Sequence, residues 1–218
     1  MQFGAMQALV GRRLAEQTGR TFWSAADIAT AINDGYLEVS DATEWQEQYF
    51  EIDLLNNRPY YDLRTVIGPS FLAIRPAWNE QTSQWLLPTS VRQFDSHDRR
   101  WEMVTGTPQR ILLRGLWWLG YWPRVQADVG TVKQYYVALP TRLIEDTDEP
   151  GFPEPFHDAC VEYALSDLHA QDGETALAVS WWSQYLATET RLRTWVADRA
   201  MVPMLMGYGE AQWIGIAR

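Results

Sequence analysis

The stretch Ser24-Ala25-Ala26-Asp27-Ile28-Ala29-Thr30-Ala31-Ile32-Asn33-Asp34-Gly35-Tyr36 has the pattern of a helix start followed by an amphipathic helix. Ser24 and Asp27 form a capping-box pattern, in which each side chain can bond the backbone N–H of the other residue. The apolar residues that follow recur three and four apart and predict one buried face: Ile28, Ile32, Tyr36 and Val39. Such a helix must pack its apolar face against another element.

Three further helices are expected. Upstream, four apolar residues recur at helical spacing: Met6, Leu9, Val10 and Leu14. Gly19 is expected to end this first helix. Pro153 and Pro155 suit the first turn of a third helix, and Gly173 suits its C-terminal end. The last helix is predicted from about Glu174 to Ala200.

The middle of the chain changes to an alternating pattern rich in aromatic and β-branched residues, which is typical of β-strands. The strand candidates are Tyr49–Leu54, Trp85–Leu87, Ile111–Trp122 and Val132–Ala138. The third candidate is apolar on both faces, so we expect one face in the core and the other in the core or in a contact. Proline and glycine punctuate the region, and we expect a compact antiparallel insertion, either a sandwich or a barrel.

Together these patterns predict an α+β protein. It would contain a helical bundle of two N-terminal and two C-terminal helices, a central antiparallel β insertion and an extended C-terminal tail. The expected boundaries are 1–44 and 140–201 for the bundle, 45–139 for the insertion and 202–218 for the tail. Residues 140–155 contain an acidic run and are expected to be a solvated linker, or a charge complement to the next helix. Their spacing lacks the glycine and the terminal Glu of a calcium-binding loop.

The composition favours protein contacts over DNA recognition. The formal net charge is −10, and reading of DNA sequence is not expected because phosphate binding needs a basic surface. The chain has 12 Trp, a residue that is favoured in protein interfaces and also builds sugar-binding platforms. Neither a signal-peptide pattern nor an apolar run of membrane-spanning length is found, so no membrane partner is expected.

Motifs for catalysis, cofactor binding and metal binding are missing from the sequence. It contains no phosphate-binding glycine loop and no Cys-x-x-Cys, His-Glu-x-x-His or Gly-x-Ser-x-Gly pattern. Cys160 lies in an apolar helical pattern and is expected to be a buried, inert thiol. His97, His157 and His169 lie far apart and are expected to be surface or locally bonded residues. We therefore expect a protein that is not an enzyme and holds no cofactor and no metal.

The last predicted helix carries apolar residues on two faces. One stripe alternates three and four apart: Ala178, Trp181, Tyr185, Thr188, Leu192 and Trp195. Trp182, Leu186 and Val196 widen this stripe beyond one face. Because one core cannot cover two faces, we expect a neighbouring subunit on the second. The candidate subunit-interface residues are Trp181, Trp182, Tyr185, Leu192 and Trp195.

The tail, 202–218, is apolar and rich in glycine and methionine, with few charges. A segment of this composition either docks on a partner or folds back over its own core. The candidate docking residues are Met204, Met206, Tyr208, Trp213, Ile214 and Ile216.

Two stretches resemble the head-to-tail adaptor (head completion or neck connector) proteins of tailed bacteriophages. The first is Phe22–Tyr36, in which an aromatic residue and a cap precede an acidic-Ile pair, Ile-Asn and a small-aromatic pair. The second is Tyr135–Gly173, with a closing strand, a linker with Leu-Pro and an acidic pair before proline, and the following helix. The resemblance spans about residues 1–200 and leaves the tail uncovered.

The resemblance implies a structural role in the virion. Such adaptors form a ring of about a dozen copies below the portal, which extends the DNA channel and receives the next tail component. The expected partners are further copies of the chain as a dodecamer, the portal protein, on which the tail residues dock, and a downstream tail or neck protein. Genomic DNA is expected to pass through an acidic lumen without sequence-specific binding. The expected location is the virion neck, after assembly in the host cytoplasm.

Two other interpretations stay open from the sequence. The first is a Trp-rich carbohydrate- or peptide-binding module of a phage tail component. The second is an enzyme with a carboxylate pair, for which Asp95, Asp98 and Glu102 near Trp101 are the candidates. Ring formation or portal binding favours the adaptor, whereas sugar binding by a monomer favours the binding module.

Overall fold

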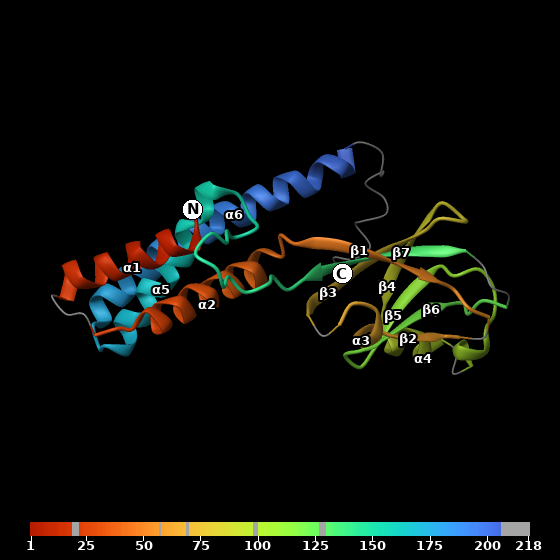
Figure 1. Cartoon of the computed structure of the whole chain (residues 1–218). Helices are drawn as coiled ribbons and strands as arrows, with labels where there is room; N and C mark the ends of the chain where they lie inside the picture. The colour runs from red at the N-terminus through yellow and green to blue at the C-terminus, as the bar shows by residue number, and fades with distance from the viewer. Residues whose placement is uncertain (19–21, 57, 69, 98–99, 127–129, 206–218) are drawn as a thin grey trace. The chain divides into compact units, whose positions relative to one another are not determined.

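The computed structural model describes residues 1–18, 22–56, 58–68, 70–97, 100–126 and 130–205. It is an α+β protein made of two compact units (Figure 1). The helical unit consists of Met1–Trp45 together with the chain from Pro140 onward, and the β unit consists of Gln46–Leu139. The predicted α+β class is therefore confirmed.

The helical unit contains α1 (Phe3–Thr18), α2 (Ala25–Thr43), α5 (Asp158–Gln171) and α6 (Thr175–Leu205), with a short 3-10 turn, η2 (Glu154–Phe156), before α5. The predicted capping box is confirmed, because Asp27 N–H donates to Ser24 Oγ at 3.2 Å and Ser24 N–H donates to Asp27 Oδ2 at 3.0 Å. Gly173 follows α5 with a φ of 82°, a left-handed conformation that glycine adopts without strain. Of the helices in the described part of the chain, none is long and apolar enough to cross a bilayer.

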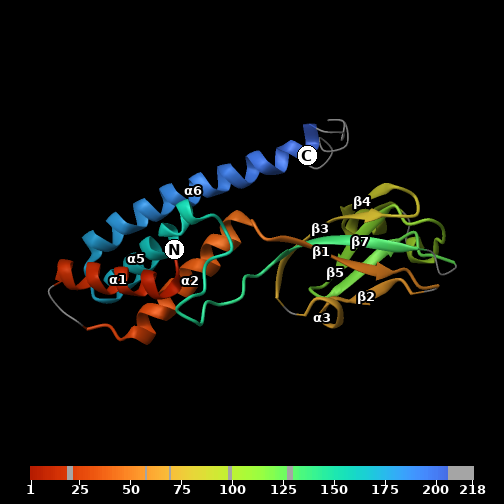
Figure 2. The same cartoon turned by 45° about the horizontal axis from the view of Figure 1, so that its top comes forward.

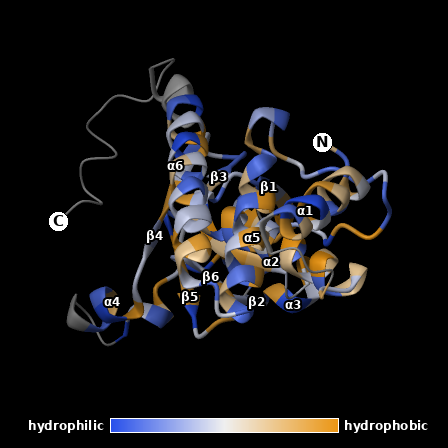
Figure 3. Cartoon of the chain, turned by 90° about the vertical axis from the view of Figure 1, so that its left-hand side faces the viewer, coloured by the Kyte–Doolittle hydropathy of each residue, from blue (hydrophilic) through white to orange (hydrophobic). Residues whose placement is uncertain are grey.

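One hydrophobic core joins these four helices. The predicted stripe of α2 is buried and packs with apolar residues of α1, α5 and α6. Figure 2 shows the helices side by side, and Figure 3 shows hydrophobic segments where α1, α2 and α5 face one another. Gly35 allows α2 to approach α5 closely, because a Cβ atom there would lie 2.9 Å from the Cβ atom of Tyr163.

The segment between Pro140 and Pro155 is anchored in this core at two points, so the prediction of a solvated linker holds only for its exposed acidic residues. Leu143 and Phe152 are both buried among the helices. The acidic run caps its own turn, since Asp148 Oδ2 accepts the backbone N–H of Ile144 and Glu145 at 2.7 and 2.8 Å. A few apolar residues are enough to anchor such a segment when its backbone groups are hydrogen-bonded. The acidic composition does not show these hydrogen bonds.

Asn33 makes the main connection between α2 and this segment. Its Nδ2 donates to Leu143 O at 3.0 Å, and its Oδ1 accepts Leu143 N–H at 2.8 Å. The Asn33 side chain is buried, so both backbone groups of Leu143 are satisfied where water does not reach them.

The β unit is one curled, mixed sheet with the strand order β1-β7-β3-β4-β5-β6-β2. The strands are β1 (Glu47–Asp53), β2 (Tyr60–Asp62), β3 (Phe71–Asn79), β4 (Gln84–Thr89), β5 (Arg110–Arg114), β6 (Trp118–Trp122) and β7 (Thr131–Ala138). The first and last strands pair antiparallel along their full length, and Ala138 N–H donates to Gln46 O at 2.9 Å. The chain therefore enters and leaves this unit on neighbouring strands.

Two predictions about the sheet are wrong. Ile111–Trp122 is not one strand but a hairpin of β5 and β6, which turns at Gly115 with a φ of 63°. The sheet is not wholly antiparallel, because β4 and β5 pair in parallel. Their connection contains α4 (Val91–His97) and the 3-10 turn η1 (Trp101–Met103), and it is long enough for the crossover that parallel strands require.

Strand β3 had no predicted counterpart because Pro76 lies within it. The structure places Pro76 in a register shift between Ile74 and Ala77, where the missing N–H of proline costs no ladder hydrogen bond. The sheet encloses a second core of mainly aliphatic residues, among which Leu63, Leu86, Ile111 and Leu119 are fully buried.

We predict that Asn33→Ala lowers the free energy of unfolding by roughly 2–4 kcal/mol, because the N–H and C=O groups of Leu143 lose their partners in a buried site. Thr30→Ala, on the exposed side of the same helix, is the control and should change stability by about 0.5 kcal/mol or less. Denaturant unfolding followed by circular dichroism measures both. Equal effects of the two substitutions would contradict the role of Asn33.

Candidate interaction surfaces

The predicted stripe of α6 is mostly core of the same chain. Trp181, Tyr185 and Leu192 are buried against α1, α2 and α5 of the same chain. The Trp181 ring also lies under the Arg13 guanidinium, with 5.0 Å between Cζ and the ring centroid. Trp195 packs partly buried against the same core, with its ring 6.0 Å from that of Phe156.

The second apolar face of α6 consists of Val179, Trp182 and Leu186, which we call the outer stripe. Their exposed fractions are 59%, 40% and 43%, whereas that of Trp181 is 9%. The residues lie three and four apart, so they fall on one side of the helix. The Trp182 ring contacts Tyr185 and Tyr163 at 5.0 and 6.0 Å between centroids, which holds its position.

Of the five candidate subunit-interface residues, only Trp182 lies on the outer stripe. Val196, expected on the second face, packs partly buried on the core instead. Val179 is not among the predicted residues, although its spacing to Trp182 and Leu186 indicates the same face of the helix. Of the docking residues, Met204 lies in the last turn of α6, and Met206, Tyr208, Trp213, Ile214 and Ile216 lie outside the described residues.

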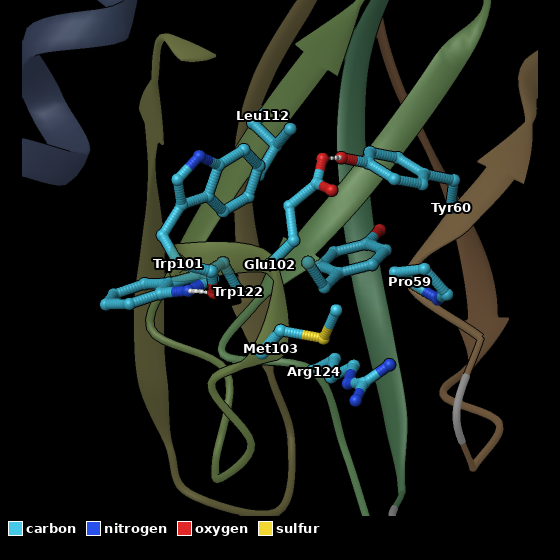
Figure 4. A pocket seen from close by; sticks show the side chains of 9 residues that line it. Pro59, Tyr60, Trp101, Glu102, Met103, Leu112, Trp122 and Arg124 are labelled. Carbon is cyan, nitrogen blue, oxygen red and sulfur yellow. Dashed lines mark hydrogen bonds between the residues drawn. The ribbon is translucent and has the colours of Figure 1, made fainter. Parts of the chain in front are cut away.

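The β unit has a pocket on the outer face of its hairpin, with a volume of about 130 Å³ (Figure 4). Leu112 and Trp122 supply part of its floor from β5 and β6, and the 3-10 turn Trp101–Met103 forms one wall. Tyr60 of β2 crosses Gly120 of β6, where an added Cβ atom would lie 2.8 Å from the ring. Glycine at this position therefore allows Tyr60 to reach the pocket.

The carboxylates near Trp101 are bound in structural contacts. Glu102 Oε1 accepts the Tyr60 hydroxyl at 3.0 Å and pairs with Arg114 Nη1 at 3.2 Å. Burial, followed by the hydrogen bond to Glu102, raises the pKa of Tyr60. Asp95 Oδ1 accepts the Trp101 indole N–H at 2.8 Å, and Asp98 lies outside the described residues.

A second hollow of the β unit, of about 450 Å³, is polar. The described residues that line it include no aromatic side chain: Asn79, Gln81, Thr82, Gly106, Thr107, Pro108 and Gln126. It therefore does not provide the aromatic platform on which the sugar-binding interpretation depends.

Cys160 and the histidines occupy structural positions. Cys160 is wholly buried, which confirms the expected burial of its thiol, and burial raises the pKa of the thiol. His157 is also buried and bonded locally, with Nε2 2.7 Å from Phe152 O. This agrees with the expectation of a surface or locally bonded residue. His169 is buried too, so it does not lie at the surface. Within the described ranges, no three His, Cys, Asp or Glu side chains are grouped to hold a metal.

Comparison with known families agrees with the resemblance drawn from Phe22–Tyr36 and Tyr135–Gly173. The model of the SU10 adaptor protein family matches residues 1–206, which is nearly the whole chain. The chain belongs to the SU10 adaptor family. It is a family of phage head-to-tail adaptors, and the predicted kinship is therefore confirmed. A comparison with curated proteins gave no match.

Both units carry exposed apolar residues, and an adaptor protein contacts other proteins. Exposed apolar groups on an otherwise acidic chain are candidates for contacts with other proteins. The outer stripe supplies one group. In the hairpin, Leu113, Leu116 and Trp118 are exposed.

We predict that the two adjacent tryptophans of α6 differ in their effect on the isolated chain. Trp181→Ala should lower the free energy of unfolding by about 3–5 kcal/mol, because it empties a buried site. Trp182→Ala should lower it by about 0.5–1.5 kcal/mol, since its ring is partly exposed and loses contacts with Tyr163 and Tyr185. Equilibrium unfolding of both variants measures the difference, and equal losses would exclude the distinction between the two faces.

Proposed function

We propose that this SU10-family adaptor forms a homo-oligomeric ring of about a dozen copies below the portal of a tailed phage. The ring extends the DNA channel and connects the head to a downstream tail or neck protein. The virion neck is its location, after assembly in the host cytoplasm. The observation that supports this most is the family match over residues 1–206.

The outer stripe of α6 supports contact between copies in this ring. In the proposal, α1, α2, α5 and α6 form the helical bundle of each copy, and Val179, Trp182 and Leu186 pack against the next one. At 31 residues, α6 is longer than α5, which has 14. Its rise of about 1.5 Å per residue therefore carries it beyond α5 and gives a neighbour a long surface to contact.

The charge of the chain supports passage of DNA. With a formal net charge of −10, a channel lined by this protein repels phosphate, so DNA can slide without being held. The proposal includes no catalytic step. The two described carboxylates of the candidate pair, Asp95 and Glu102, are used in hydrogen bonds to Trp101 and Tyr60.

The experiment that tests the ring compares Leu186→Asp with Gln184→Asp. Both substitutions add one carboxylate to an exposed position of α6, but only Leu186 belongs to the outer stripe. We expect Leu186→Asp to weaken assembly on portal-bearing heads at least about 10-fold, because a central interface residue contributes about 2 kcal/mol or more. Gln184→Asp should assemble normally.

Quantitative binding to purified heads, with imaging of the neck, measures the outcome. Both variants must melt like the parent protein for the comparison to hold, which the exposure of the two positions favours. Normal rings with Leu186→Asp would exclude the outer stripe as the subunit contact. If particles assembled with the unaltered protein had necks that lack it, the adaptor role itself would be excluded.

We also propose that the C-terminal tail docks on the portal through Met204, Met206, Tyr208, Trp213, Ile214 and Ile216. Deletion from Gly207 onward should leave the melting temperature unchanged and abolish attachment to portal-bearing heads, because large apolar residues supply most interface energy. A large fall in melting temperature would show instead that the tail packs on its own chain.

A further inference from the structure

The pocket on the hairpin of the β unit has two polar ends of different character. At one end, Glu102 accepts the Tyr60 hydroxyl and pairs with Arg114, so its charge is balanced. At the other end, Figure 4 shows Arg124 beside Met103, on the side of the pocket away from the bond between Glu102 and Tyr60. The two ends are separated by aromatic side chains that line the pocket.

Arg124 brings to the pocket a cationic side chain with one buried donor atom that has no acceptor among the described residues. Its Nε is buried and makes no hydrogen bond to any described residue. Its backbone is held on both sides, since Arg124 N–H donates to Val104 O at 3.2 Å and Arg124 O accepts Gly106 N–H at 2.9 Å. A buried donor without an acceptor, on a backbone that is held in place, marks a place where an acceptor can bind.

The walls of the pocket are fixed by hydrogen bonds and ring stacking. The Trp122 indole N–H donates to Trp101 O at 2.8 Å, and Phe94 stacks on Trp101 with 4.8 Å between centroids. Met103 and Val104 beside the pocket are 71% and 39% exposed, so its rim is apolar. A ligand that fits must therefore combine an apolar group with an anionic one.

We propose that this pocket binds a carboxylate side chain, next to an apolar residue, from an extended segment of a partner protein. The carboxylate pairs with the Arg124 guanidinium, and the neighbouring apolar side chain packs on Met103 and the aromatic walls. A volume of about 130 Å³ suits one side chain and is smaller than the pockets that hold drug-sized ligands. Arginine is the residue best suited to carboxylates, because its fork of N–H groups matches both oxygens.

This inference goes beyond the proposed ring, because it names a second contact, on the β unit, and the chemistry that the partner must carry. It concerns neither the outer stripe nor the tail. It can therefore fail while the ring assembles, and it can succeed in a protein that forms no ring.

The test is titration of the full-length protein with three short peptides that differ in one residue: acetyl-Gly-Phe-Asp-Gly-amide and its Asn and Lys counterparts. The indole N–H signals of Trp101 and Trp122 in ¹H–¹⁵N spectra report on the pocket, and variants with Phe at each position assign them. We expect the Asp peptide to shift both signals and to bind at least about 10-fold more tightly than the other two, as charge-assisted hydrogen bonds do.

The matched variants are Arg124→Gln and Arg110→Gln. Arg110 is an exposed residue of β5 that does not line the pocket, so its loss changes the net charge equally. Arg124→Gln should remove the preference for the Asp peptide, and Arg110→Gln should keep it. Unchanged thermal melting of both variants shows that the unit is intact.

Several outcomes would overturn the proposal. These are equal binding of the Asp and Asn peptides, loss of binding with both arginine variants, or no shift with any peptide. Phenylacetate binding as tightly as the Asp peptide would show that a free carboxylate, and not a protein segment, is the ligand. Shifts caused by maltose in place of the peptides would assign the pocket to sugar binding instead.

Discussion

The helical unit depends on a pair of hydrogen bonds between Asn33 and the backbone of Leu143, which join segments 110 residues apart. These bonds fix the path of the returning chain, so that Leu143 and Phe152 complete the core that α1 and α2 begin. The same segment leads into η2 and α5 through the buried His157. Because these elements cover one side of α6, Val179, Trp182 and Leu186 on a neighbouring side of the helix are exposed to solvent.

In the β unit, the pairing of the first and last strands fixes where the chain enters and leaves the unit. Residues Glu47–Asp53 of β1 pair with Thr131–Val137 of β7, so the chain enters and leaves the unit on neighbouring strands. The strands between them are then free to extend the sheet to β2 on its far side. That extension places the outer face of the β5–β6 hairpin under the turn Trp101–Met103 and creates the pocket.

The large aromatic residues therefore serve two purposes in this adaptor. Trp181 and Tyr121 fill the two cores, and burial raises the pKa of Tyr121 well above its usual range. Trp182 and Trp118 remain exposed, one on each unit, where a neck protein can offer contacts to other chains. The tryptophans are thus divided between the packed interior and exposed positions.

The sequence by itself determined the features that depend on nearby residues. The capping box of α2, its apolar stripe, the glycine after α5 and the burial of Cys160 were predicted because their signals lie within a few residues of one another. The kinship with phage adaptors was also predicted, from the short motifs of Phe22–Tyr36 and Tyr135–Gly173.

Only the tertiary structure decided the features that join distant residues. The turn at Gly115, the parallel pairing of β4 with β5 and the burial of Leu143 and Phe152 all depend on which segments meet in space. The same holds for the pocket, whose residues come from several elements. It also holds for the burial of Trp181 and the exposure of Trp182. Adjacent residues of a helix point about 100° apart, and only the position of the other helices determines which of the two is covered.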